Sequence, residues 1–196
     1  MAEFEFAFSL FGLLLGFTLV EVLSGLARSI KRVRTRHRAE ADSIRIGWLT
    51  PILALFVLLD VSSYWENVWS VRHSVTVGFD FLFGGLLITG TYYFAASMVF
   101  PDDLKNWPDL DEWFWSHRRQ ALAPLFVANA AWMAYIVSMR TPQDAVGPAM
   151  LLQAAYFVPL AIAIVAKRPV MVGGALVFLN AAYLYFAIAS AVSRVA

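Results

Sequence analysis

The sequence contains no cysteine, and this absence excludes disulfide bonds, thiolate nucleophiles and thiolate metal ligands. Histidine is scarce, because only His37, His73 and His117 are present and all three lie outside the apolar segments. This placement argues against a buried haem with histidine ligands. The chain also lacks His-Glu-x-x-His, Gly-x-Ser-x-Gly and a glycine-rich phosphate loop. We therefore expect no enzyme activity, no cofactor and no metal site.

Charged residues are also few, at 15% of the chain, whereas 60% of the residues are hydrophobic. The mean hydropathy of +0.66 is far above that of soluble proteins. Six apolar segments approach or exceed the length of about 20 residues that a spanning helix needs. They cover residues 6–27, 48–69, 75–100, 121–138, 146–166 and 170–192. The sequence thus predicts an all-α fold, in which residues 1–196 form one polytopic domain with six transmembrane helices.

The basic residues are distributed unevenly over the predicted loops. Of the 15 lysines and arginines, seven lie within residues 28–45, three within 101–120 and two within 167–169. Cytoplasmic loops carry an excess of Lys and Arg, so these three loops are expected in the cytoplasm. Both the N-terminus and the C-terminus are then outside. We expect a multi-pass protein of the bacterial inner (plasma) membrane.

Two of the predicted cytoplasmic loops have a composition that suits the membrane surface. The basic loop 28–45 is expected to attract anionic lipid. Nucleic acid is not an expected partner, because this basic run is short, adjoins a membrane segment and includes no recognition module. The loop 101–120 mixes tryptophans with charged residues, which predicts a cytoplasmic interfacial segment at the headgroups.

Asp60 is the most informative residue of the chain, because it lies in the middle of the apolar segment 48–69. Counted from either Trp48 or Pro51, it lies roughly 14–18 Å deep in a hydrocarbon layer of about 30 Å. A charged aspartate at that depth costs about 2.5–3.5 kcal/mol on insertion scales. Such residues face a bundle interior, a partner or a pathway.

Further polar residues surround Asp60 in the predicted second and third helices. Asp60, Ser63 and Asn67 share one helix face by their spacing, and Glu66 lies on an adjacent stripe. Asp80 is about two turns into the next helix, so Asp60, Glu66 and Asp80 are expected to share a polar zone in the outer half of the bundle. Two interpretations remain open for this zone: a structural cluster neutralised by hydrogen bonds or protonation, and a site or pathway.

Three other polar residues lie inside apolar segments. Glu21 is on the first helix, where it reaches the inner interface or pairs with a basic residue. Asn129 and Asn180 lie near mid-depth in the fourth and sixth helices. Single asparagines in membrane helices most often form hydrogen bonds between helices.

Small residues at helical spacing predict close helix packing. Gly12 and Gly16 lie four residues apart on one face of the first helix, and Gly84 and Gly85 lie in the third. Glycines let two helix backbones approach closely, within one chain or between chains.

Two classes of function fit these observations. The first is an oligomeric channel or transporter for an ion, a proton or a small solute, with its polar zone around Asp60. The second is a non-catalytic accessory or assembly subunit of a larger membrane complex. A homo-oligomer or a membrane-complex partner is expected in either case.

Overall fold

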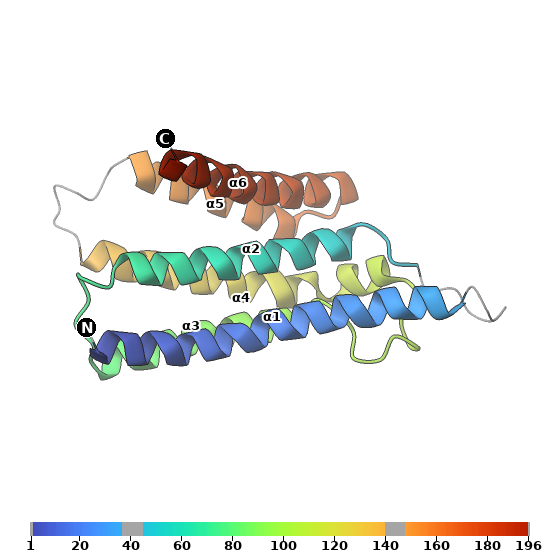
Figure 1. Ribbon diagram of the computed structural model, residues 1–196. Coiled ribbons are helices and arrows are strands. Elements are labelled where there is room, and N and C mark those ends of the chain that lie inside the picture. The colour runs from blue at the N-terminus through green and yellow to red at the C-terminus, as the bar shows by residue number, and fades with distance from the viewer. Residues whose placement is uncertain (1, 37–44, 140–147, 196) are drawn as a thin grey trace.

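The computed structural model is all-helical and describes residues 2–36, 45–139 and 148–195, with the side chains of 34–36, 148–154 and 194–195 left aside. Six helices follow one another along the chain (Figure 1). They are α1 (Ala2–Arg36), α2 (Leu49–Ser70), α3 (Phe79–Ser97), α4 (Leu110–Ser138), α5 (Pro148–Val165) and α6 (Pro169–Val195).

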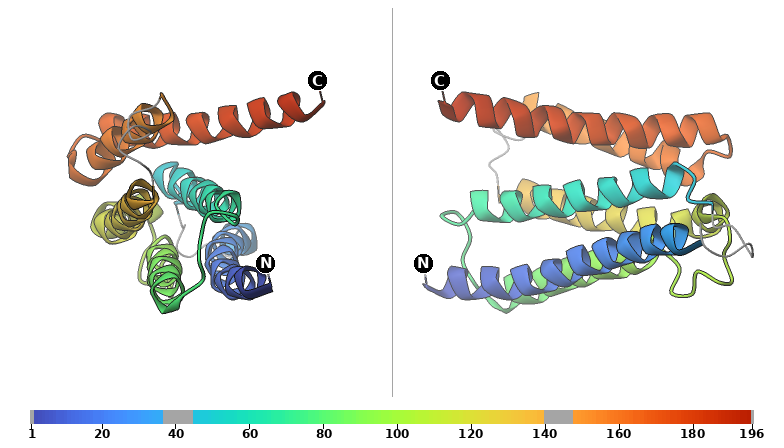
Figure 2. Two further views of the ribbon diagram at one scale, coloured as in Figure 1. Left: turned by 90° about the vertical axis from the view of Figure 1, so that its left-hand side faces the viewer. Right: turned by 45° about the vertical axis from the view of Figure 1, so that its right-hand side comes forward.

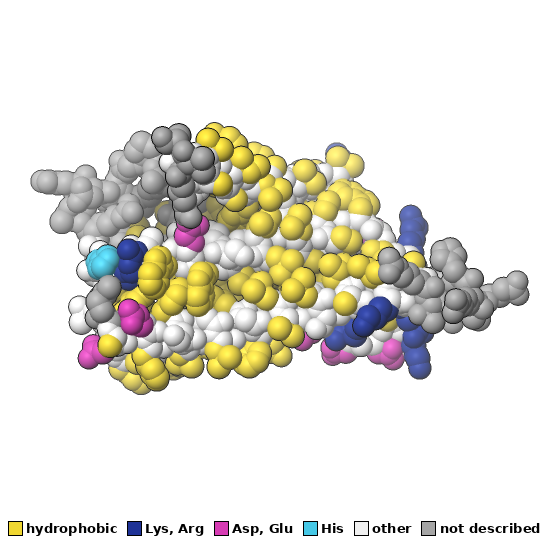
Figure 3. Space-filling view, in the orientation of Figure 1, with side chains coloured by type: hydrophobic (Ala, Val, Ile, Leu, Met, Phe, Trp, Pro, Cys, Tyr) yellow, Lys and Arg dark blue, Asp and Glu magenta, His cyan; other side chains and the backbone are white. Residues whose placement is uncertain are grey.

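Five of these helices, α1, α2, α3, α4 and α6, are long and apolar enough to cross a membrane. Within the described part of the chain, α5 contributes the shorter apolar stretch Ala155–Val165. Hydrophobic side chains cover the middle of the molecular face in Figure 3, and charged side chains gather toward its two ends. Large apolar side chains such as Phe6, Phe17 and Phe178 are half or more exposed. This surface is that of a multi-pass helical membrane protein.

Helices that follow one another along the chain run in opposite directions, and together the helices form a ring (Figures 1 and 2). Around the ring the neighbours are α1, α3, α4, α5, α6 and α2, and α2 closes the ring against α1. Because α2 also contacts α3 and α4, it packs against four other helices. Both termini lie at one end of the bundle, which we call the terminal end. The other end, where α1 ends and α4 and α6 begin, is called the basic end.

Several predicted boundaries change in the structure. The first helix is longer than the predicted segment 6–27, since it continues to Arg36, and the third is shorter than 75–100. The second half of the predicted interfacial loop 101–120 is helical, because α4 already begins at Leu110. The Asp109 carboxylate accepts a hydrogen bond from the Asp111 N–H at 2.8 Å and caps this helix start. Residues 37–44 of the predicted basic loop and residues 146–147 of the predicted fifth segment lie outside the described residues.

At the basic end, the segment before α2 is fastened to the start of α4. The Arg45 N–H donates to the Pro108 carbonyl at 2.7 Å, and the Leu110 N–H donates to the Arg45 carbonyl at 2.9 Å. The Thr50 hydroxyl then donates to the Leu110 carbonyl at 2.7 Å. These bonds fix the register of α2 against α4, and with it the height of Asp60 in the bundle.

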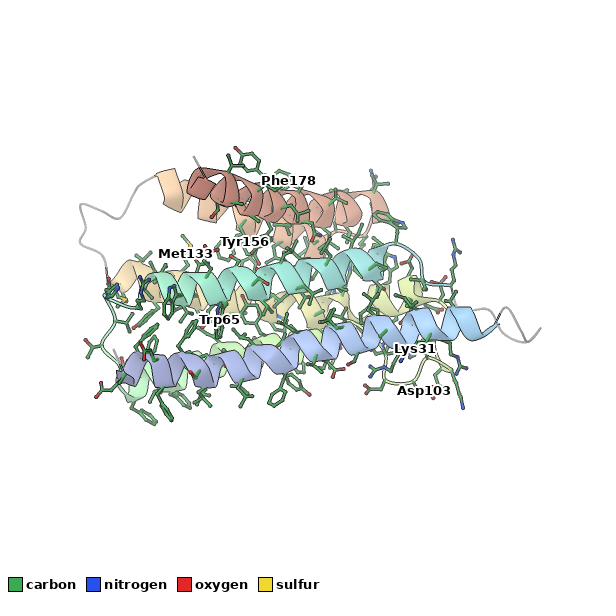
Figure 4. The ribbon with its side chains drawn as sticks, in the orientation of Figure 1. Lys31, Trp65, Asp103, Met133, Tyr156 and Phe178 are labelled. Atoms are coloured by element: carbon green, nitrogen blue, oxygen red, sulfur yellow. The ribbon has the colours of Figure 1, made fainter. Side chains whose placement is uncertain are left out.

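Two glycines give α1 its contacts with α2 and α3. A Cβ on Gly12 would lie 2.2 Å from the Trp65 ring of α2, and a Cβ on Gly85 of α3 would lie 2.1 Å from the Phe11 ring of α1. Figure 4 shows Trp65 between α2 and α1. Gly16 and Gly84 have no atom within 4 Å of such a Cβ, so they contribute no such contact within the described chain.

Candidate functional site

The Asp60 carboxyl lies inside the bundle and collects hydrogen bonds from other helices. Its side chain is 1% exposed. The Tyr156 hydroxyl of α5 donates to Oδ1 at 2.9 Å, and the Tyr183 hydroxyl of α6 donates to the same oxygen. The Asn129 Nδ2 of α4 donates to Oδ2 at 3.0 Å. One carboxyl therefore connects α2 to three helices that follow it in the chain.

A fifth helix joins the cluster through Tyr92 of α3, which is fully buried. Its hydroxyl lies 3.1 Å from Asn129 Nδ2 and also within hydrogen-bonding reach of the Asp60 carboxyl. Asn129 Nδ2 lies 3.2 Å from the Tyr156 hydroxyl as well, so both phenols lie next to this amide. We call Asp60, Tyr92, Asn129, Tyr156 and Tyr183 the Asp60 cluster. Every helix except α1 contributes one side chain to it.

Position along the helices explains why these five side chains meet. Asp60 lies in the middle of α2, which packs against α3, α4 and α6. Tyr156 lies between the α5–α6 pair and α2 (Figure 4). The Phe56 ring, one turn from Asp60, has its centroid 6.3 Å from that of Tyr156 and 6.2 Å from that of Tyr183. The polar tips thus converge on Asp60 while their rings pack in an apolar shell.

A polar chain leads from the cluster toward the terminal end. Ser63 lies one turn after Asp60, and its hydroxyl is within hydrogen-bonding reach of Tyr183. Asn67, one further turn along, has its Nδ2 3.4 Å from the Ser63 hydroxyl. Both residues are partly exposed. From Asp60 to Asn67 this polar chain covers about 10 Å of α2, at about 1.5 Å per residue. It stops three residues before the end of the helix.

Toward the basic end the polar chain stops after one more residue. Asn180 lies one turn before Tyr183 and donates to the Ile52 carbonyl at 3.2 Å. Its buried Oδ1 has no hydrogen-bond donor among the described residues. Directly beyond it, one buried leucine from each of three helices follows: Leu53 of α2, Leu160 of α5 and Leu176 of α6. The cluster is therefore continued by polar groups on one side and closed by leucines on the other.

The other acidic residues singled out in the sequence do not join Asp60. Glu66 and Asp80 are both exposed, Glu66 in the last turns of α2 and Asp80 in the first turn of α3. The shared zone of three carboxyls does not form, because α3 begins only at Phe79 and holds Asp80 at the end of the bundle. Glu21 lies on α1 with its Oε1 3.8 Å from Arg28 Nη2, so it pairs with a basic residue.

The three tyrosines are the partners that the sequence reading missed. A signal was present, because Tyr92, Tyr156 and Tyr183 each lie well inside an apolar segment and not at its ends. A buried tyrosine hydroxyl usually finds a hydrogen-bond partner, so a mid-segment tyrosine indicates a polar group on a neighbouring helix. Which polar group it meets depends on the helix arrangement, which the sequence alone does not give.

Comparison with protein-family models, with curated proteins and with solved structures gives no match to this chain. Among the residues that the structure describes, no three His, Asp or Glu side chains gather as metal ligands would. The candidate site is thus defined by its own geometry: one carboxyl, three phenols and one amide, held by five helices.

Proposed function

We propose that this protein is a membrane transport protein that binds a proton at Asp60 and exchanges it with the terminal end of the bundle. One observation carries the proposal: a carboxyl that is 1% exposed receives hydrogen bonds from several other helices and is continued by a polar chain through Ser63 and Asn67. Ionisable residues within membrane segments mark ion pathways and proton relays.

The occupancy of the carboxyl favours a proton over a larger ion. A carboxylate has about four lone-pair sites. Tyr156 and Tyr183 occupy Oδ1, and Asn129 occupies Oδ2 with Tyr92 close by. A metal cation would have to displace these donors. A proton adds no heavy atom, and a phenol hydroxyl can turn from donor to acceptor where the proton binds.

The arrangement also suggests how proton binding would be coupled to movement. The donors stabilise the charged carboxylate, whereas burial disfavours it. Because the donors belong to α4, α5 and α6, a shift of these helices relative to α2 would change the balance between the two forms. The leucines beside Asn180 separate the cluster from the basic end, so release on that side requires such a shift.

The proposal includes a topology and a location. We place both termini outside and the basic end in the cytoplasm of a bacterial inner membrane, with six crossings. The charge distribution supports this orientation, because Arg28, Arg45 and Lys105 are among the cations at the basic end. We propose no catalytic role for the chain.

Asp60→Asn tests the function, because it keeps the shape of the side chain and removes its proton exchange. The wild-type protein, reconstituted in proteoliposomes containing a pH-sensitive dye, should dissipate an imposed pH gradient, and the variant should not. Asp80→Asn is the matched control, since Asp80 is exposed at a helix start. A variant that moves protons as fast as the wild type, or a wild type that moves none, contradicts the proposal.

A spectroscopic measurement separates proton binding from transport. Infrared difference spectra recorded while the pH changes should contain the carbonyl stretch of a protonated carboxyl, and Asp60→Asn should remove that band. If the band is unchanged in the variant, the titrating carboxyl is another residue.

An accessory subunit is the second candidate, and the surface of α6 favours it. From Ala181 to Ser193, nearly every residue of α6 is partly or fully exposed, and this half of the helix extends away from the other helices (Figure 2). A partner subunit or a second copy would cover it. Native mass spectrometry of the extracted protein distinguishes these: multiples of 21.9 kDa indicate a homo-oligomer. A heavier mixed complex whose wild-type form moves no protons favours the accessory role.

A further inference from the structure

Arg118 of α4 is a buried cation whose contacts are incomplete. Its side chain is 4% exposed, at the basic end of the bundle. Nη2 donates to the Ala166 carbonyl, just after α5 ends, and the guanidinium lies 4.2 Å from the centroid of the Trp115 ring. Nη1 is buried and has no hydrogen-bond acceptor among the described residues. This donor therefore points to a missing acceptor.

Three exposed cations lie at the same junction of α4, α5 and α6. Arg119 follows Arg118, and its Nε donates to the Ile164 carbonyl at 3.3 Å. Lys167 and Arg168 form the turn that joins α5 to α6, directly after the carbonyl that Arg118 binds. We call Arg118, Arg119, Lys167 and Arg168 the α4–α5 basic site.

Among the described residues, no carboxylate is seen in an ion pair with the α4–α5 basic site. The ion pairs Arg28–Glu21 and Arg45–Asp109 lie elsewhere at this end. Each of the two arginines has one backbone carbonyl as its hydrogen-bond acceptor. A buried charge is costly unless it is paired and hydrogen-bonded. Within the described part of the chain, these four cations form no ion pair, and one of them is buried with a donor that lacks an acceptor, so the arrangement points to an anion as the missing partner.

The level of the site in the bundle indicates which anion it takes. Trp115 stacks on Arg118, and the Trp48 ring of the segment before α2 lies against Gly173 in the first turns of α6, where a built Cβ would approach it to 2.0 Å. Tryptophan is enriched at the level of the lipid headgroups. Arginine binds phosphate oxygens through its planar fork of donors.

We propose that the α4–α5 basic site binds the phosphate of an anionic phospholipid in the leaflet at the basic end. Arg119, Lys167 and Arg168 make the exposed contacts, and the lipid charge compensates the buried Arg118. The inference does not depend on proton transport at Asp60, which lies in the middle of the bundle. Free inorganic phosphate offers the same chemistry, so the experiment has to separate the two sources.

The test uses the whole protein in nanodiscs of phosphatidylcholine, with and without phosphatidylglycerol. Native mass spectrometry should detect retained phosphatidylglycerol, and the lipid should raise the melting temperature. The variant Arg119→Gln with Lys167→Gln and Arg168→Gln should bind it on the order of 100-fold more weakly, at about one decade or less per cation. A control variant, Lys31→Gln with Arg32→Gln and Lys105→Gln, removes the same charge at the same end and should retain the lipid.

The outcomes are distinct. Loss in the first variant alone supports the site. Equal loss in both variants indicates attraction to the overall positive end and overturns the proposal, as does unchanged binding in the first variant. Millimolar inorganic phosphate that displaces the lipid and raises the melting temperature equally would assign the site to soluble phosphate and overturn the lipid assignment. Arg118→Gln gives an independent readout, because it should abolish the rise in melting temperature that phosphatidylglycerol causes.

Discussion

The Tyr183 hydroxyl of α6 donates a hydrogen bond to the Asp60 carboxyl of α2, across 123 positions of the sequence. This bond lies at the point where α6 leaves the bundle. Before it, Leu176, Leu179 and Asn180 are buried, and after it nearly every residue is partly or fully exposed. Tyr183 is therefore the last residue of α6 that attaches this helix to the cluster.

Tyr183→Phe should lower stability, because it keeps the ring and leaves a buried acceptor with one donor fewer. The expected loss is about 1–3 kcal/mol, the range for a hydrogen bond to a charged or buried group. Tyr185→Phe is the control: this ring is 67% exposed, and its change should stay within about 0.5 kcal/mol. Thermal melting of both variants in nanodiscs measures the difference. Equal melting temperatures would mean that the Asp60–Tyr183 bond does not hold α6.

The sequence predicted the centre of this site but not its shell. Asp60 is recognisable because a carboxyl in an apolar segment must face something polar. Asn129 and Asn180 were also singled out, and only Asn129 reaches Asp60. Tyr92, Tyr156 and Tyr183 were missed, since tyrosine is common at membrane interfaces and its depth becomes informative only when the neighbouring helix is known.

Gly12→Leu should destabilise the packing of α1 on α2. A Cβ at Gly12 already meets the Trp65 ring at 2.2 Å, and that ring is held by Phe8, whose centroid lies 3.9 Å away. A leucine at this position would press on the Trp65 ring and, through it, on Phe8, and overpacking of this kind costs about 1–3 kcal/mol. Thermal melting is again the measurement.

Gly16→Leu is the matched control for that experiment, because a Cβ at Gly16 meets no atom within 4 Å. A monomer should tolerate it without loss of stability. If it lowers stability or changes the native mass, Gly16 lies at a contact between two copies of the chain. Gly12 and Gly16 lie on the same face of α1 by their spacing. Within the described chain, a side chain of α2 comes close to Gly12 and not to Gly16.

Gly47→Ala should destabilise the connection between α2 and α4. Gly47 has a φ of +60°, which favours glycine, and its Cβ would lie 2.2 Å from the Asp111 carboxylate. That carboxylate accepts a hydrogen bond from the Leu49 N–H at 3.2 Å, so the added methyl group would disrupt it. We expect a loss of about 1–3 kcal/mol in the free energy of unfolding.

Gly174→Ala serves as the comparison, since it lies within α6 with no atom within 4 Å of a built Cβ. Alanine is the better helix former, so this variant should be neutral or slightly more stable. If Gly47→Ala melts at the same temperature as Gly174→Ala, the segment before α2 is not fixed to α4 in the way described.

Helix ends were less predictable than helix positions. The apolar pattern located the apolar part of each helix. The helix α4, however, begins before its apolar part and includes Asp111, Glu112 and Arg118, and a search for apolar residues does not detect such charged turns. The capping by Asp109 and the acidic first turn are the signals of this earlier start. With α4 beginning at Leu110, Pro124 lies in its interior and removes one backbone hydrogen bond there.

Topology is testable directly, because the chain has no cysteine. Glu3→Cys and Ser193→Cys place single thiols at exposed positions of the terminal end, and Lys105→Cys places one at the basic end. With six crossings and the basic end in the cytoplasm, a membrane-impermeant maleimide should label the first two variants in intact cells. It should label Lys105→Cys only after permeabilisation. The reverse pattern would invert the orientation, and labelling of Glu3→Cys without Ser193→Cys would give an odd number of crossings. Since α5 has the shortest apolar stretch among the described residues, the pair formed by positions 3 and 193 is the decisive comparison.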